Sequence, residues 1–165
     1  MAFDTISNQI LDAIQSLLED EVQDEFVALS MPGMDVHVIV DEERMRPESW
    51  PAFYLIDLNE TQKYGDATID GVSGKQNVSK RYDVLWVVKA TPEVQDVRRW
   101  AVAVGDVVAA TIEDNCFLGG LVYDTNVDSL EVLDPINAGS ALICRGRAAL
   151  TVLHQRTLGT HGAEA

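Results

Sequence analysis

The stretch KRYDVLWVVKA, residues 80–90, indicates the fold more clearly than any other part of this 165-residue chain. Its residues alternate between two faces, and both faces are largely apolar near the centre. The alternation predicts a β-strand. Apolar residues on both faces predict a central strand, or one whose second face is covered by a partner. The first face carries Tyr82, Val84, Trp86 and Val88.

A helical pattern follows this strand. Apolar residues recur every three or four positions from Val94 to Ile112, which predicts an amphipathic helix. We expect Thr91-Pro92-Glu93 to open it, because threonine caps a helix and proline favours its first position. Gly119-Gly120 should end the unit.

A second helical pattern precedes the strand at the N-terminus. Isoleucines and leucines over residues 6–18 share one stripe, and Asp4 or Thr5 can cap its start. The same periodicity continues through Val22, Phe26 and Leu29. One long helix and two short helices are both compatible with this pattern.

The remaining segments complete an α+β pattern. Strands are predicted at 35–40, 52–58, within 121–133 and at 141–153, with a turn at 134–139. The order of elements predicts a mainly antiparallel sheet with two main helices packed on one face.

A long polar connection interrupts this pattern at residues 59–79. Its glycines predict a protruding loop or hairpin arm, with extended pieces at 68–69 and 77–78. The chain length suits a single domain spanning residues 1–165. We expect a frayed tail from His154 onward, flexible over about 155–165.

The composition restricts the function classes. Lysine and arginine number 12 and aspartate and glutamate 27, so the formal net charge is −15. Such a surface repels nucleic acid and anionic membranes. No apolar run approaches the ~18 residues that span a bilayer, and the first residues lack the pattern of a signal peptide. Cys116 and Cys144 predict small buried thiols in a reducing compartment, although a disulfide between them stays open.

No pattern of residues predicts chemistry. His37, His154 and His161 are interpreted as ordinary surface or rim side chains. Residues 124–128 resemble the opening of a calcium loop, but Ser129 stands where that loop needs glycine. We therefore predict no catalytic residue, no metal site, no cofactor and no enzymatic activity.

The arginines are more informative. Arg98 and Arg99 lie off the apolar stripe of the predicted second helix, while Arg145 and Arg147 lie on one side of the last strand. Guanidinium groups in so acidic a chain can contact acidic surfaces of a neighbouring copy, or can pair with carboxylates of their own chain. Both interpretations remain open from the sequence.

Several local phrases resemble one protein family. They are PAFYL at 51–55, the glycine-rich arm, RYDVLWVV at 81–88, the helix at 94–112 and FLGGLV at 117–122. Together with the element order over residues 6–152, they resemble the tail terminator and tail-completion proteins of long-tailed bacteriophages and related viruses. The strong acidity and the long 35–50 connection depart from that pattern.

The resemblance implies a structural role in the neck region of the virion tail, after assembly in the host cytoplasm. Such proteins form a homo-oligomeric ring, expected to be a hexamer, that stops polymerisation of the tail tube. The ring contacts the tail tube protein and a head-completion or connector protein, and DNA passes through it without sequence-specific binding.

Under this resemblance, the arm and the arginines are the expected contact residues. They are Tyr64, Ile69, Val72, Lys75, Arg98, Arg99, Arg145 and Arg147. The alternatives are another head–tail joining protein of the same virion, or a small ligand-binding α+β domain.

Overall fold

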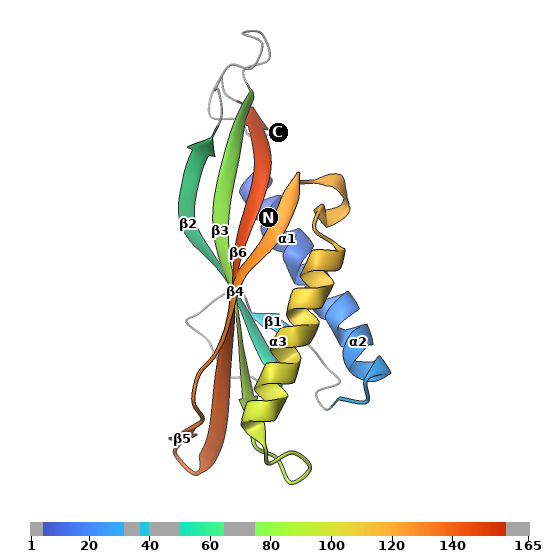
Figure 1. Ribbon diagram of the computed structural model, residues 1–165, viewed down its shortest axis with the longest axis vertical. Helices are drawn as coiled ribbons and strands as arrows, with labels where there is room; N and C mark the ends of the chain where they lie inside the picture. The colour runs from blue at the N-terminus through green and yellow to red at the C-terminus, as the bar shows by residue number, and fades with distance from the viewer. Residues whose placement is uncertain (1–4, 32–36, 40–49, 65–74, 158–165) are drawn as a thin grey trace.

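Figure 1 shows a sheet with its helices gathered on one side. The computed structural model describes residues 5–31, 37–39, 50–64 and 75–157. The helices are α1 (Ile6–Leu17), α2 (Gln23–Ala28) and α3 (Val97–Asp114). The strands are β1 (His37–Ile39), β2 (Ala52–Tyr64), β3 (Lys75–Lys89), β4 (Asp124–Val132), β5 (Ile136–Ala138) and β6 (Ala141–Thr157).

The strands form one six-stranded sheet in the order β1-β2-β3-β6-β4, with β5 also paired to β6. Every pairing is antiparallel except the short parallel pairing of β1 with β2. The chain leaves β3, passes through α3 to the outer strand β4, and returns as β6 between them. The predicted α+β fold is confirmed, and residues 80–90 lie mostly in a central strand.

Side chains from the sheet and helices meet in one hydrophobic core. The face of β3 that carries Tyr82, Val84, Trp86 and Val88 points toward the helices, and all four side chains are fully buried. The apolar stripe of α3 packs on the same core through Val97, Ala101, Val104, Val108 and Ile112. Both predicted patterns are confirmed.

The N-terminal pattern forms one continuous helical segment with an irregular middle. Thr5 caps it, because its hydroxyl accepts a hydrogen bond from the backbone N–H of Asn8 at 3.4 Å. A π-helical segment, Leu18–Val22, joins α1 to α2. The prediction that Leu29 continues the buried stripe is wrong, since this side chain lies just after the helix and is 55% exposed.

The π-helical segment keeps the buried row on one side. Buried residues recur at every fourth position, namely Ile6, Ile10, Ile14, Leu18, Val22 and Phe26. Four residues exceed one α-helical turn of 3.6, so such a row drifts around an ordinary α-helix. A π turn contains more residues than an α turn and therefore reverses the drift.

Helix α3 begins later than predicted. Thr91 and Val94 form a separate turn, in which the Thr91 hydroxyl accepts from the Val94 N–H at 3.1 Å. Asp96 is the actual cap, and its carboxylate accepts from the backbone N–H of Arg99 at 3.2 Å. Thr91 and Asp96 are both possible caps, and the structure uses Asp96. This residue directly precedes Val97, which is buried and is the first residue of the helix.

The predicted arm is partly sheet. Strand β2 extends to Tyr64, which pairs with Asn77, and β3 begins at Lys75. Val78 is buried at 1% exposure and pairs with His154 of β6. Backbone pairing with β6 extends the sheet into a segment whose polar side chains suggested a loop. Residues 65–74, including the predicted 68–69 piece, lie outside the described residues.

The C-terminal prediction also needs correction. Strand β6 continues past Leu153 to Thr157, so His154 is a strand residue with only 2% exposure rather than the start of a frayed tail. The predicted turn at 134–139 contains strand β5, which folds back on β6. Residues 158–165 lie outside the described part of the chain.

Candidate functional site on the helix-free face of the sheet

The two faces of the sheet differ in what covers them. All three helices of the described residues lie on one face (Figure 1). Strand alternation places Leu85 and Val87 of β3 on the opposite face, which we call the helix-free face. The register pairs Leu85 with Arg147 and Val87 with Arg145, so two predicted arginines lie beside two apolar side chains. Leu85 and Val87 are only partly buried.

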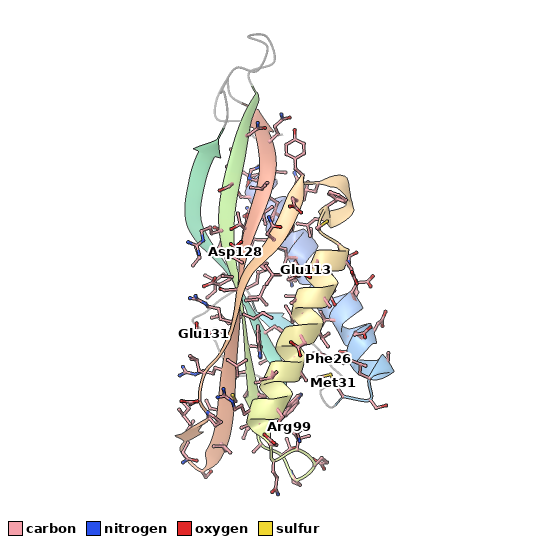
Figure 2. The ribbon with its side chains drawn as sticks, in the orientation of Figure 1. Phe26, Met31, Arg99, Glu113, Asp128 and Glu131 are labelled. Atoms are coloured by element: carbon pink, nitrogen blue, oxygen red, sulfur yellow. The ribbon has the colours of Figure 1, made fainter. Side chains whose placement is uncertain are left out.

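A groove of about 360 Å³ lies at this position. Apolar side chains from β2, β3 and the segment after β4 form most of its wall, and charged groups of β4 and β6 stand at its rim. In Figure 2, Glu131 projects from β4 to the side away from α3. The lining residues are Tyr54, Leu85, Trp86, Val87, Glu131, Leu133, Arg145, Gly146 and Arg147.

The groove depends on a tight contact beneath it. A Cβ atom added at Gly146 would lie 2.2 Å from Cε2 of Trp86, so no larger residue fits there without movement of the ring. On its other side the ring approaches α3, where a Cβ at Gly105 would lie 2.9 Å from Cζ2 of Trp86. The indole N–H of Trp86 donates to the carbonyl oxygen of Ala101 at 3.1 Å. Trp86 therefore joins the sheet to α3 directly under the groove.

The arginines at the rim have different local partners. Arg147 lies 3.8 Å from the Asp83 carboxylate and 3.9 Å from the Glu131 carboxylate, and its side chain is 46% exposed. Such long, solvated contacts are weak. Arg145 is exposed and forms no ion pair with the carboxylates of the described residues. The Arg145 guanidinium group can therefore bind a carboxylate of another molecule by donating hydrogen bonds to it.

Burial shifts the pKa of two ionisable groups near the groove. Burial raises the pKa of the Tyr54 phenol above its ordinary value. Burial also raises the pKa of the Cys144 thiol, and this effect exceeds the opposing influence of Arg98 and Arg145. The Cys144 thiol is buried and donates to the carbonyl oxygen of Leu133 at 3.2 Å.

The other predicted arginines lie elsewhere. Arg98 is on α3 and pairs with Asp134 at 2.9 Å, so local pairing is its observed state. Arg99 is exposed on the same helix. Arg98 and Arg99 belong to α3 of the helix layer, whereas Arg145 and Arg147 lie on β6, opposite Val87 and Leu85 of the helix-free face.

The arm residues are also separate from the groove. Tyr64 ends β2 and Lys75 begins β3, ten or more residues along the hairpin from Val87. At ~3.3 Å per residue, this corresponds to roughly 30 Å or more. Ile69 and Val72 lie outside the described residues.

Sequence reasoning missed the wall and the acidic partners of the groove. The facing of Glu131 and Leu133 depends on strand pairing, because a bulge between Val127 and Ser129 shifts the register of β4. Tyr54 reaches the groove because β2 pairs it with Leu85 of β3. It also missed the ion pair between buried Lys80 and Asp57, 2.8 Å apart, on the helix-covered side. The alternation in β3 was the one signal that pointed to an accessible second face.

The remaining motifs form no cluster in the described residues. Cys116 is half-buried and Cys144 buried, and both are free thiols. Residues 124–128 lie in β4 as a polar strand, where the Thr151 hydroxyl donates to Asp128. Within the described ranges, no group of three or more His, Cys, Asp or Glu side chains is placed to hold a metal ion.

Among the described helices, none has both the length and the apolar character needed to cross a membrane. No protein-family model matches the chain, and a search of curated proteins finds no matching sequence.

Proposed function

We propose that this protein is a structural component of a viral tail, a terminator that forms a ring at the head-proximal end of the tail tube. The observation that supports the proposal best is the helix-free face, where an apolar groove with arginines at its rim is suited to another protein chain. The sequence resemblance supplies the identity of that assembly. In this role the ring stops tube polymerisation and joins the tail to a head-completion or connector protein.

The charge of the chain is compatible with this role. A net charge of −15 on each copy repels DNA, so a ring lined by acidic surfaces lets DNA pass without adhesion. The same charge makes neighbouring copies repel one another. We therefore expect ring stability to fall at low ionic strength, where screening is weak.

The test combines a mass measurement with an assembly assay. Native mass spectrometry of the purified chain should show a ring-sized species, with six copies as the expected number. Purified tail tubes incubated with the protein should stop elongating. A protein that stays monomeric and fails to cap tubes would overturn the proposal, and pull-downs against tube and portal-side proteins separate a terminator from another head–tail joining protein.

The groove also supports one alternative function. Its volume of about 360 Å³ lies within the range of small-molecule sites, and its apolar wall with two guanidinium groups suits a small amphipathic anion. Thermal-shift screening with aliphatic and aromatic carboxylates tests this alternative. Saturable stabilisation of a strictly monomeric protein, lost in Arg145→Ala, would favour the ligand-binding domain over the ring.

A further inference from the structure

All charged side chains of the N-terminal helical segment are acidic. Arg44 is the first basic residue of the chain, so residues 6–28 contain no lysine or arginine. These residues form α1, the π-helical segment and α2, which cover one side of the molecule (Figure 1). Their carboxylates belong to Asp12, Glu19, Asp20, Glu21, Asp24 and Glu25.

The end of this segment combines carboxylates with exposed apolar side chains. Val27 is 49% exposed and Leu29 is 55% exposed, although both are aliphatic. Asp24 and Glu25 are exposed one turn earlier. We call these four residues the α2 tip.

The groove on the helix-free face has the complementary composition. Leu85, Val87 and Leu133 supply apolar wall. Positive charge at the rim comes from Arg145, which forms no ion pair within the described residues, and from Arg147, whose contacts with Asp83 and Glu131 are long and solvated. An apolar tip flanked by carboxylates therefore matches an apolar groove flanked by guanidinium groups. Complementary charges around an apolar centre are characteristic of specific protein interfaces.

One molecule cannot make this contact with itself. The α2 tip belongs to the helix layer, and the groove opens on the opposite face of the sheet (Figure 1). The contact must therefore join two copies. Because it uses different surfaces on the two partners, it is a head-to-tail contact, the type that closes into a ring when the rotation between copies is suitable.

We propose that the α2 tip of one copy binds the arginine-rimmed groove of the next copy. Val27 and Leu29 contact the wall formed by Leu85, Val87 and Leu133, and the tip carboxylates face Arg145 and Arg147. This inference rests on the proposed ring and assigns its subunit contact to particular surfaces.

The test reverses charge on each side of the contact in the full-length chain. Arg145→Glu changes the groove, and Glu25→Lys changes the tip. Sedimentation velocity at one fixed ionic strength measures self-association, so that screening of the whole-molecule charge stays constant. Each variant should weaken association on the order of tenfold, because like charges then face each other. The double variant Arg145→Glu/Glu25→Lys should recover association to within about threefold of the native chain.

Matched controls change charge by the same amount elsewhere. Arg99→Glu lies on α3 and Asp12→Lys lies on α1, and both positions are exposed. Each should alter association by less than about twofold, because neither residue belongs to the tip or the groove. Thermal unfolding of every variant confirms folding, and recovery in the double variant is a result that a folding defect cannot produce.

Three results would overturn the assignment. They are equal effects of test and control variants, no recovery in the double variant, and a native chain that remains monomeric at every concentration. The tube-capping assay distinguishes this failure from failure of the proposed function. A chain that caps tubes while ignoring these charge reversals keeps the function and loses this contact. A chain that associates through the contact without capping tubes supports this contact and contradicts the proposed function.

Discussion

The two faces of the sheet are built from alternate residues of the same strands, and they differ in how fully their side chains are buried. Trp86 is fully buried between Gly146 and α3, while its neighbour Leu85 lines an open groove beside Arg147. On the helix-covered face, side chains fit closely and tolerate little change. On the helix-free face, partly exposed apolar and charged side chains are available to another molecule. Substitutions should therefore affect stability on one face and association on the other.

The largest expected effect tests the helix-covered face at α3. Val104→Asp buries an unpaired charge at a position with no exposed surface, and should lower the free energy of unfolding by more than about 4 kcal/mol. Val102→Asp is the matched control on the same helix, because Val102 is 42% exposed, and it should cost less than about 1 kcal/mol. Urea denaturation followed by circular dichroism measures both. A cooperative Val104→Asp variant with native stability would show that this face is not the core.

The next effect tests the contact of Trp86 with the sheet. Gly146→Ala places a methyl group 2.2 Å from the ring atom Cε2 and should cost about 3 kcal/mol, because the buried indole must move. Gly105→Ala approaches the ring less closely and gains about 1 kcal/mol of helix propensity, so its net cost should be smaller. Tryptophan fluorescence during denaturation reports both. A larger loss from Gly105→Ala than from Gly146→Ala would contradict this description of the ring.

A smaller effect appears at alkaline pH. Burial raises the pKa of the Cys144 thiol in the folded state, so its contribution to stability is complete below the unfolded-state pKa. The contribution is lost as pH rises through the folded-state value. Unfolding free energies measured from pH 7 to pH 10 should decline less steeply for Cys144→Ala than for the native chain, and Tyr54 accounts for part of the remaining decline.

Cys116→Ala is the control for that measurement, because Cys116 is only half-buried. In thiol-labelling experiments on the folded protein, Cys144 should react more slowly than Cys116, because burial limits access and favours the protonated thiol. Equal pH slopes for all three proteins would contradict the assignment of the decline to Cys144.

The smallest effect concerns a surface ion pair. Arg98→Ala removes the contact with Asp134, but the two side chains are 52% and 95% exposed. Solvent screens such a pair, so the loss should be about 0.5 kcal/mol or less. Arg99→Ala on the same helix turn serves as the reference in the same urea titration. A loss above about 2 kcal/mol for Arg98→Ala alone would mean that this pair stabilises the end of the sheet more than its exposure allows.

The sequence predicted the helix-covered face well, because its patterns are local. The alternation around Trp86 and the stripe through Val104 each indicate an element and its buried side without knowledge of the partner. The predicted start of α3 is too early, because Thr91-Pro92 also matches the pattern of a helix start, whereas Asp96 is the residue that caps the helix. The sequence predicted a loop or hairpin arm, with an extended piece at 77–78, and a frayed tail from His154, because the full extent of both strands depends on pairing between β3 and β6.

The groove could be predicted only in part. Arg145 and Arg147 share a side of one strand, which their spacing reveals. Their apolar neighbours come from β2, β3 and the segment after β4, and the register between strands is a tertiary property. The bulge after Val127 determines the side of the sheet on which Glu131 lies, and the local sequence does not predict this bulge.

The π-helical segment Leu18–Val22 has a consequence for the geometry of the proposed ring. An α-helix turns by about 100° per residue, so if these same residues formed regular α-helix, everything beyond them would be rotated by roughly a quarter of a circle. Phe26 would then swing away from the core, and the exposed pair Val27 and Leu29 would point along a different bearing. The π-helical geometry of this short segment thus sets the direction in which the α2 tip points and, in the proposed ring, the angle at which the tip would meet the groove of the next copy.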